Sequence, residues 1–165
     1  MRNELLPQGM HIELARRADA AAIAALSRDV IETGLGWSWQ PRRVLRAIEN
    51  PEAAVIKLVA GPALAGFAIM RFGCEEAHLD LLAVKPEFRR AGNGAALLRW
   101  LEASALTAGI SIVRLELRRS NGSACRFYAR LGYSPCRVVR GYYQGREDAV
   151  QMARDLWCPL PINAT

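Results

Sequence analysis

The residues from Leu81 to Leu98, LLAVKPEFRRAGNGAALL, have the composition of a site that binds an anion. An apolar segment runs through Pro86 into two arginines and then into Gly92 and Gly94, where apolar residues at helical spacing begin. Glycine lets the backbone turn tightly enough for successive N–H groups to converge, and the start of a helix adds the positive end of its dipole. Phosphate is the anion that such a loop favours.

Two common phosphate loops do not fit this segment. Leu97 stands where the third glycine of a dinucleotide-binding G-x-G-x-x-G motif would be, and no Gly-Lys-Ser/Thr follows as in nucleoside triphosphate loops. Taken alone, the G-x-G at residues 92–94 is equally compatible with a strand-to-helix turn whose glycines only cap the helix.

A longer pattern in the same loop is more specific. Val84, Pro86, Arg89, Gly92 and Gly94 form V-x-P-x-x-R-x-x-G-x-G, which resembles the pyrophosphate loop of the GNAT superfamily of N-acetyltransferases, whose members bind acetyl-CoA. The resemblance implies that backbone N–H groups hold the pyrophosphate and that the preceding strand lies along the pantetheine arm. The cofactor contacts that it implies, all within an acyl-CoA loop at 82–95, are Leu82, Ala83, Val84, Arg89, Arg90, Ala91, Gly92, Asn93, Gly94 and Ala95.

A second segment, residues 114–133, contains side chains that can exchange protons. Alternation along the expected strand places Glu116 on the face opposite Leu115 and Leu117, so its carboxylate should point away from the core. Tyr128 follows apolar residues at helical spacing, a pattern that also fits a buried core aromatic. A tyrosine hydroxyl can donate a proton at neutral pH.

The same segment resembles the next GNAT motif, in which a strand glutamate, an asparagine, a helix tyrosine and L-G-F/Y recur. The resemblance implies that Glu116 deprotonates an amine, directly or through a water, and that Tyr128 protonates the departing CoA thiolate. It also implies a cofactor contact from Asn121, which is in addition an expected helix N-cap. The reaction would be a direct transfer in a ternary complex that needs no metal. A solvated strand charge and a core tyrosine are the alternatives for Glu116 and Tyr128.

The C-terminal part resembles the closing loop of a GNAT subfamily, the RimI-like ribosomal-protein alanine N-acetyltransferases, through G-Y-Y at 141–143 and G-R-E-D-A at 145–149. This resemblance implies that segments 33–40 and 140–149 flank an amine acceptor, with Trp37, Tyr142 and Tyr143 as contacts. A peptide or protein N-terminus is the implied acceptor. Because Gly141 replaces the usual Asn and residues 34–39 depart from the usual F-P-W-S, a small amine such as an amino acid or polyamine stays open.

The elements that must position these residues alternate along the chain. The pattern predicts strands at 11–16, 54–60, 64–72, 78–84, 112–118, 137–139 and 149–156. It predicts a helix that begins behind Asp19 as N-cap, and further helices at 40–49, 94–108 and 121–131. The expected class is α+β, and the resemblance implies a GNAT-like fold in one domain, 1–165, with a mixed, mostly antiparallel sheet of about seven strands and about four helices.

Composition narrows the class of partner. The formal charge of +6 comes almost wholly from arginine, since Lys57 and Lys85 are the only lysines, and arginine suits a phosphorylated cofactor or a nucleic acid. The arginines do not form a basic run with interleaved aromatics, so a nucleic-acid-binding domain is not favoured. A non-catalytic acyl-CoA-binding module is a further alternative to the enzyme.

The cysteines and the apolar segments give no indication of a metal site, a covalent mechanism or a membrane segment. The four cysteines are scattered without a C-x-x-C pair, so we expect reduced thiols and no metal site, and a covalent route through Cys125 lacks a recognisable histidine partner. Residues 1–13 contain no signal-like apolar stretch, and no run approaches the roughly 20 apolar residues that span a bilayer. We expect a cytoplasmic protein without a membrane partner, either a monomer or a homodimer.

Overall fold

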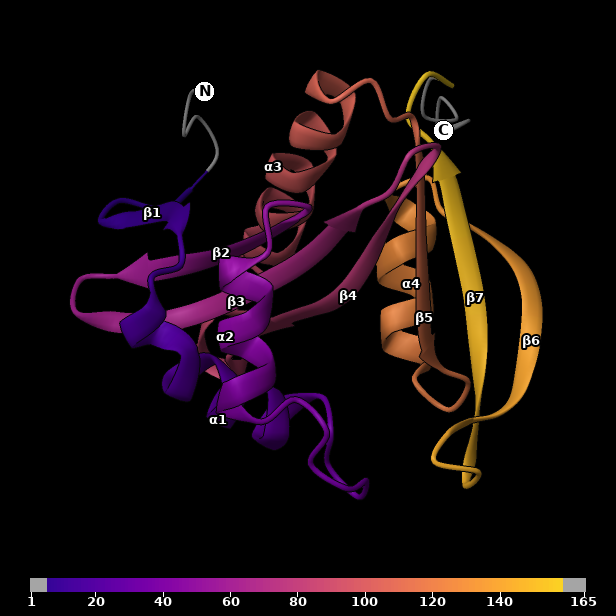
Figure 1. Ribbon diagram of the computed structural model, residues 1–165, viewed down its shortest axis with the longest axis horizontal. Coiled ribbons are helices and arrows are strands. Elements are labelled where there is room, and N and C mark those ends of the chain that lie inside the picture. Colours follow the sequence, from indigo (N-terminus) through magenta and orange to yellow (C-terminus); the bar gives the residue numbers. More distant parts are fainter. Residues whose placement is uncertain (1–5, 159–165) are drawn as a thin grey trace.

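The computed structural model describes residues 6–158, and both ends of the expected domain, 1–5 and 159–165, lie outside the described residues. Within the described part, seven strands and four α-helices follow one another (Figure 1). The elements are β1 (Met10–Leu14), α1 (Ala20–Val30), α2 (Pro41–Glu49), β2 (Ala53–Ala60), β3 (Ala63–Phe72), β4 (Glu76–Val84), α3 (Asn93–Thr107), β5 (Ile112–Arg118), α4 (Gly122–Arg130), β6 (Ser134–Tyr143) and β7 (Glu147–Asp155).

The strands form one sheet in the order β1-β2-β3-β4-β5-β7-β6. Every pairing is antiparallel except that of β4 with β5, which are joined by α3 as a parallel pair requires. This parallel pairing ends at Leu79 and Leu115, so the C-terminal half of β4 has no partner strand on the β5 side. The predicted mixed, mostly antiparallel sheet is confirmed.

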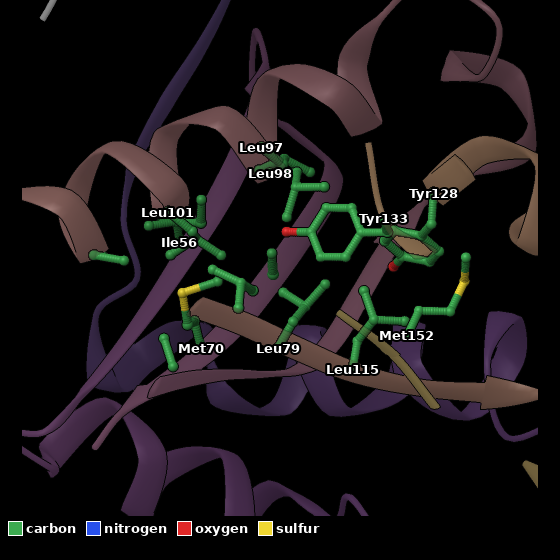
Figure 2. Packing of buried hydrophobic residues seen from close by; sticks show 14 of the residues in the cluster. Ile56, Met70, Leu79, Leu97, Leu98, Leu101, Leu115, Tyr128, Tyr133 and Met152 are labelled. Carbon is green, nitrogen blue, oxygen red and sulfur yellow. The ribbon is translucent and has the colours of Figure 1, made fainter. Parts of the chain in front are cut away.

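Helices cover both faces of the sheet, but not equally. Helices α3 and α4 pack on one face, where Leu97, Leu98 and Leu101 of α3 contribute to a large buried cluster that also contains Tyr128 and Tyr133 (Figure 2). Helices α1 and α2 pack on the other face (Figure 1). That second cluster contains no buried residue of β5, β6 or β7. The face of these three strands opposite α3 and α4 is therefore open for polar side chains.

A β-bulge in β4 changes which side chains reach the open face. Ile69 pairs with Leu81 and Met70 with Leu79, so Asp80 is an extra residue without a partner in β3. Leu79 belongs to the α3-side cluster, whereas Leu81 belongs to the α1-side cluster. A bulge of this kind re-aims side chains and is common beside active sites.

Two predicted details differ in part from the structure. Helix α1 begins directly behind Asp19, as predicted, but the Asp19 side chain does not cap it; its carboxylate accepts a hydrogen bond from the Arg16 N–H at 2.7 Å and pairs with Lys57 at 2.9 Å. The strand predicted at 137–139 is the ten-residue edge strand β6. Most of β6 is exposed, so it carries no apolar periodicity, and its length comes from backbone pairing with β7.

Candidate active site

The loop between β4 and α3 has backbone N–H donors that no described residue accepts. Arg90 and Gly92 both have left-handed backbone, with φ of 65° and 79°, and α3 begins directly afterwards at Asn93. Among the described residues, none accepts a hydrogen bond from the backbone N–H groups of residues 90–95. The loop residues 89–92 are exposed. Unpaired N–H groups at the start of a 15-residue helix form a binding site for an anion.

Side chains under the loop hold it in this shape. Asn93 is 2% exposed and donates its amide to the Phe88 carbonyl at 2.7 Å, while the Arg89 guanidinium donates to the Val84 carbonyl at 2.8 Å. A Cβ at Gly94 would lie 3.2 Å from the Phe127 ring, so the start of α3 packs against α4 at a distance that only glycine permits without a shift. The side chains thus fix the loop and leave its backbone for a ligand.

The preceding strand offers a free backbone edge. Leu82, Ala83 and Val84 pair with β3 on one side and have no strand partner on the other. The side chains of Ala83 and Val84 are buried, at 3% and 7% exposed, so a ligand beside β4 would meet main-chain groups. An extended amide-containing chain such as pantetheine fits such an edge, and the adjoining loop fits its pyrophosphate.

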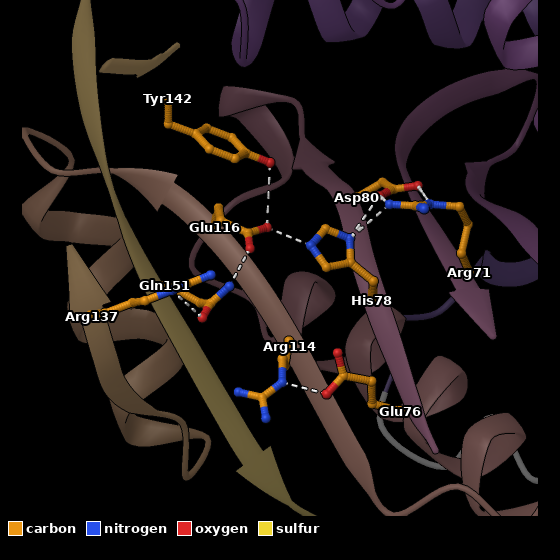
Figure 3. Close-up of polar contacts among 9 residues, drawn as sticks. All are labelled: Arg71, Glu76, His78, Asp80, Arg114, Glu116, Arg137, Tyr142 and Gln151. Carbon is orange, nitrogen blue, oxygen red and sulfur yellow. Dashed lines mark hydrogen bonds and ion pairs between the residues drawn. The ribbon is translucent and has the colours of Figure 1, made fainter. Parts of the chain in front are cut away.

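On the open face of the sheet, Glu116 is the centre of a polar cluster (Figure 3). As alternation predicts, Leu115 and Leu117 are in the α3-side core, and the Glu116 side chain lies on the opposite face. It is only 8% exposed, because Gln151 of β7 donates to it at 2.7 Å, Tyr142 of β6 donates at 3.5 Å, and it also bonds His78.

His78 links two carboxylates. Its Nε2 bonds Glu116 and its Nδ1 lies 2.7 Å from Asp80, which Arg71 of β3 holds through two contacts of 2.6 Å (Figure 3). Burial alone would lower the pKa of His78, but the hydrogen bonds to Asp80 and Glu116 outweigh it and raise the pKa to about 9. Burial likewise opposes ionisation of the two acids, yet hydrogen bonds from His78, together with those from Arg71 and Gln151, hold the pKa of both Asp80 and Glu116 below ordinary values.

Tyr128 lies on the other face of the sheet. Its side chain is 8% exposed and packs edge-on against Phe127 and Tyr133. No described residue forms a hydrogen bond with its hydroxyl, and burial raises the pKa of the phenol. The group is therefore neutral and able to donate a proton. Glu116 and Tyr128 do not touch each other, because they lie on opposite faces of β5.

The two segments expected to flank the acceptor are joined directly. Gln144, between β6 and β7, accepts a hydrogen bond from the Gly36 N–H at 2.9 Å and donates to the Gly36 carbonyl at 3.0 Å. Arg118 adds a second link, since its guanidinium donates to the Thr33 carbonyl at 2.7 Å and to Glu147 at 2.6 Å. Segments 33–40 and 140–149 are thus neighbours in space.

A buried carboxylate shapes the first of these segments. Glu32 is 7% exposed and accepts hydrogen bonds from the Ser38 N–H at 2.8 Å, the Ser38 hydroxyl at 2.5 Å and the Trp39 N–H at 3.2 Å. Trp37 donates its indole N–H to the Ala24 carbonyl at 3.2 Å. Trp37 therefore anchors the segment to α1, and its contact with substrate stays a prediction.

Sequence comparisons match this chain to a known family and to named relatives. Residues 22–133 match the family model described as "Acetyltransferase (GNAT) family". The [ribosomal protein bS18]-alanine N-acetyltransferase of Salmonella typhimurium is 41% identical over 111 residues, which are 66% of this chain and 71% of that protein. The Escherichia coli K12 enzyme of the same name is 39% identical over 103 residues, 61% of this chain and 66% of that protein.

Solved structures show the same fold. The crystal structure of the ribosomal-protein-S18-alanine N-acetyltransferase from Escherichia coli has a TM-score of 0.78 and 27% identity, covering 91% of this chain and 96% of that one. The PaiA N-acetyltransferase from Thermoplasma acidophilum, solved in complex with coenzyme A, has a TM-score of 0.77 at 20% identity, covering 88% and 98%. The chain belongs to the acetyltransferase (GNAT) family. It is an N-acetyltransferase.

In this acetyltransferase the predicted residues separate into two groups. Residues 82–95 form one continuous segment from the end of β4 to the start of α3, and Asn121 caps α4 by accepting the Ala124 N–H at 3.0 Å, as predicted. Glu116 and Tyr142 are in contact, and the Tyr142 and Tyr143 rings pack edge-on with centroids 5.0 Å apart. The cofactor contacts and the catalytic roles stay predictions.

Of the residues in the cluster around Glu116, the sequence pointed to Tyr142 but not to His78, Asp80 or Gln151. His78 and Asp80 stand two residues apart in an otherwise apolar strand, HLDLLAV. Such an isolated polar pair in an apolar strand indicates a functional site. Gln151 lies opposite Glu116 in the pairing of β5 with β7, which no local pattern reveals. Its orientation is set by Arg137, which donates to the Gln151 carbonyl oxygen at 3.1 Å and so turns the amide NH2 toward Glu116.

The cysteines, the possible metal ligands and the helices bear on a covalent route, a metal site and a membrane span. All four cysteines are free thiols, and Cys125 has no imidazole partner, because both ring nitrogens of His78 bond carboxylates and His11 lies beside Glu13. Within residues 6–158, no group of three or more His, Cys, Asp or Glu side chains is arranged to hold a metal ion. In the same part of the chain, no helix has the length and hydrophobicity needed to cross a membrane.

Proposed function

We propose that this acetyltransferase transfers an acetyl group from acetyl-CoA to the N-terminal α-amine of a peptide or protein. The observation that carries the proposal is Glu116, a nearly buried carboxylate on the open face of the sheet, beside the joined segments 33–40 and 140–149. The relatives named above as [ribosomal protein bS18]-alanine N-acetyltransferases support a protein terminus as acceptor.

The backbone N–H groups of residues 90–95 would hold the pyrophosphate of acetyl-CoA, and the free edge of residues 82–84 would hold its pantetheine arm. The unpaired donors at these positions fit that assignment. Bound in this way, acetyl-CoA supplies a thioester whose acetyl carbon is open to attack by an amine. Asn121 remains a proposed additional contact.

Two side chains would handle the protons. Glu116, directly or through a water, takes a proton from the attacking amine, and Tyr128 gives its hydroxyl proton to the leaving sulfur. The two groups lie on opposite faces of β5, which suits a reaction in which amine and thioester approach from different sides. Much of the rate would come from holding both reactants in place, since well-oriented reactions reach effective molarities of about 10⁵ M or more.

The preference for an α-amine has a physical basis. An α-amine has a reference pKa of about 8 and a lysine side chain about 10.4, so forming the neutral nucleophile at pH 7 costs about 1.4 and 4.6 kcal/mol respectively. The hydrogen bonds that Glu116 accepts keep its pKa low, so it is a weak base. A weak base can therefore deprotonate an α-amine more readily than a lysine side chain, because the α-amine requires less free energy.

Mass spectrometry of the products tests the proposal. The acceptor is a peptide that begins with alanine and contains one internal lysine, and the matched control is the same peptide with its N-terminus already acetylated. We expect the enzyme to add one acetyl group to the alanine nitrogen of the first peptide. We expect it to add no further acetyl group to the control. Acetylation of the lysine in both peptides would contradict the proposal, and binding of acetyl-CoA without transfer to any amine would indicate a binding module.

One observation favours a second acceptor class, small amines. The two hydrogen bonds between Gln144 and Gly36 bridge the segments that flank the acceptor and limit the room between them. A panel of free amino acids and polyamines, run beside the peptides, distinguishes the two classes. Acetylation of free amines alone would select the small-molecule acceptor.

A further inference from the structure

His78 stands between two carboxylates that are almost removed from solvent. Asp80 is 7% and Glu116 8% exposed, against 27% for His78 itself. Each ring nitrogen bonds one of them, and Asp80 in turn is held by Arg71 (Figure 3). The imidazole therefore has a fixed orientation, with Nε2 directed at Glu116.

The transfer reaction leaves a proton without an assigned destination. An ammonium group that becomes an amide loses two protons. One of them replaces the hydroxyl proton that Tyr128 gives to the sulfur, and the other must leave the site. The other leaves through Glu116, whose accepted hydrogen bonds favour the ionised form and make it a poor final acceptor. A base in contact with Glu116 is needed to complete the transfer.

We infer that His78 is a positioning residue that aims Glu116 at the amine and takes over the proton that Glu116 removes. This inference rests on the proposed function. The step requires the neutral imidazole, which carries its proton on Nδ1 and leaves Nε2 free to accept. The amine N–H bond breaks as an O–H bond forms at Glu116; that O–H bond then breaks as an N–H bond forms at Nε2 of the neutral His78. Asp80 accepts the hydrogen bond from Nδ1–H and stabilises the imidazolium, which afterwards releases its proton to water.

The charged groups around His78 come from four strands and together favour its cationic form. Arg114 lies opposite His78 in the pairing of β4 with β5, but it forms an ion pair with Glu76. Burial raises the pKa of Tyr142, so this neighbour is neutral. The titratable and charged groups facing His78 are Arg71 of β3, Glu76 and Asp80 of β4, Arg114 and Glu116 of β5, and Tyr142 of β6. An ammonium group arriving beside Glu116 adds positive charge and so favours release of the proton from His78, which restores its acceptor form.

The kinetic test is His78→Gln, because glutamine can still donate a hydrogen bond to Glu116 but cannot take a proton. At pH 8 we expect turnover with saturating substrates to fall about tenfold or more, with an unchanged KM for acetyl-CoA. The wild-type kcat should rise with pH up to about 9, and the variant should lack this rise. His11→Gln, which alters the only other histidine, should behave as wild type. A variant with wild-type kcat and pH profile would overturn the inference.

A second measurement needs no acceptor. In the His11→Gln protein, the single remaining histidine signal in proton nuclear magnetic resonance reports His78 directly. We expect it to titrate near pH 9 and to shift to lower pH when Glu116→Gln is added. A midpoint near 6.5 that ignores Glu116→Gln would overturn the inference. If the wild type failed to acetylate peptides, the proposed function would fall, while this titration would still show whether His78 and Glu116 act as a pair.

Discussion

The cofactor loop and the acceptor cluster are built in opposite ways. The loop, residues 86–95, is one continuous segment whose free groups are backbone N–H donors. The acceptor cluster consists of six side chains from five strands, namely Arg71, His78, Asp80, Glu116, Tyr142 and Gln151. A backbone site depends on glycines at fixed spacing, whereas a side-chain site depends on sheet register. The loop can therefore be recognised from one short segment of sequence, whereas the cluster depends on how five strands pair.

The largest expected effect is loss of acetyl-CoA binding in Gly92→Glu. A carboxylate here would repel the pyrophosphate and block the N–H groups, and losing two charge-assisted hydrogen bonds corresponds to about 10³-fold weaker binding. Calorimetry measures this. Gly109→Glu is the matched control, since Gly92 and Gly109 have φ of 79° and 80° and no atom within 4 Å of an added Cβ, but Gly109 lies at the far end of α3. Equal losses in both variants would mean that strain, not the site, is responsible.

The second expected effect is a loss of turnover without a loss of acetyl-CoA affinity. Glu116→Gln should lower turnover about 10²-fold while acetyl-CoA affinity stays at the wild-type value, because the residue lies outside the loop. Steady-state rates with saturating peptide, together with calorimetry, separate the two quantities. Weakened acetyl-CoA binding would show that the two halves of the site are not independent.

Tyr128→Phe should lower turnover about 10- to 10²-fold without a change in melting temperature, since the lost hydroxyl has no partner among the described residues. Tyr133→Phe is the converse control. Its hydroxyl donates to the buried Glu102 at 2.9 Å, so its removal should lower stability by about 1–3 kcal/mol and leave turnover nearly unchanged. Wild-type turnover in Tyr128→Phe would exclude it as the proton donor.

The acceptor cluster should also make stability depend on pH. The pKa of His78 is raised to about 9, so its stabilising contribution is complete below pH 6.5 and is lost as the pH rises through 9. Asp80 and Glu116 have lowered pKa values, so their contributions exist above about pH 4.5 and are lost in acid. The difference in unfolding free energy between wild type and His78→Gln should be largest near pH 6 and about 1–3 kcal/mol smaller by pH 10. A difference independent of pH in denaturant titrations would contradict this.

The smallest expected effect concerns the bridge between the acceptor segments. Gln144→Ala removes two hydrogen bonds to Gly36 and should raise the KM for peptide about two- to fivefold, with unchanged KM for acetyl-CoA. The exposed Gln8→Ala serves as control. A lower KM would mean that the bridge obstructs the peptide, and it would favour the small-amine acceptor.

The sequence predicted the strand-loop-helix unit and most elements because their signals are local. Alternation around Glu116 and the cap at Asn121 could be read within a few residues. The neighbours of Glu116 could not be predicted in this way. Gln151 is fixed by the pairing of β5 with β7, and Tyr142, on an exposed edge strand, was named through the family resemblance and not as a contact of Glu116. The bulge at Asp80 also breaks the strict alternation on which strand reasoning depends.

Hydrogen exchange measured by mass spectrometry tests most directly whether the loop binds the cofactor and the two flanking segments bind the acceptor. The wild-type protein is labelled alone, with coenzyme A, and with coenzyme A plus the alanine-initiated peptide. We predict that coenzyme A slows exchange at residues 90–95, whose N–H groups have no partner among the described residues, and that the peptide slows exchange in segments 33–40 and 140–149. Unchanged exchange at residues 90–95 in the presence of saturating coenzyme A would contradict the account.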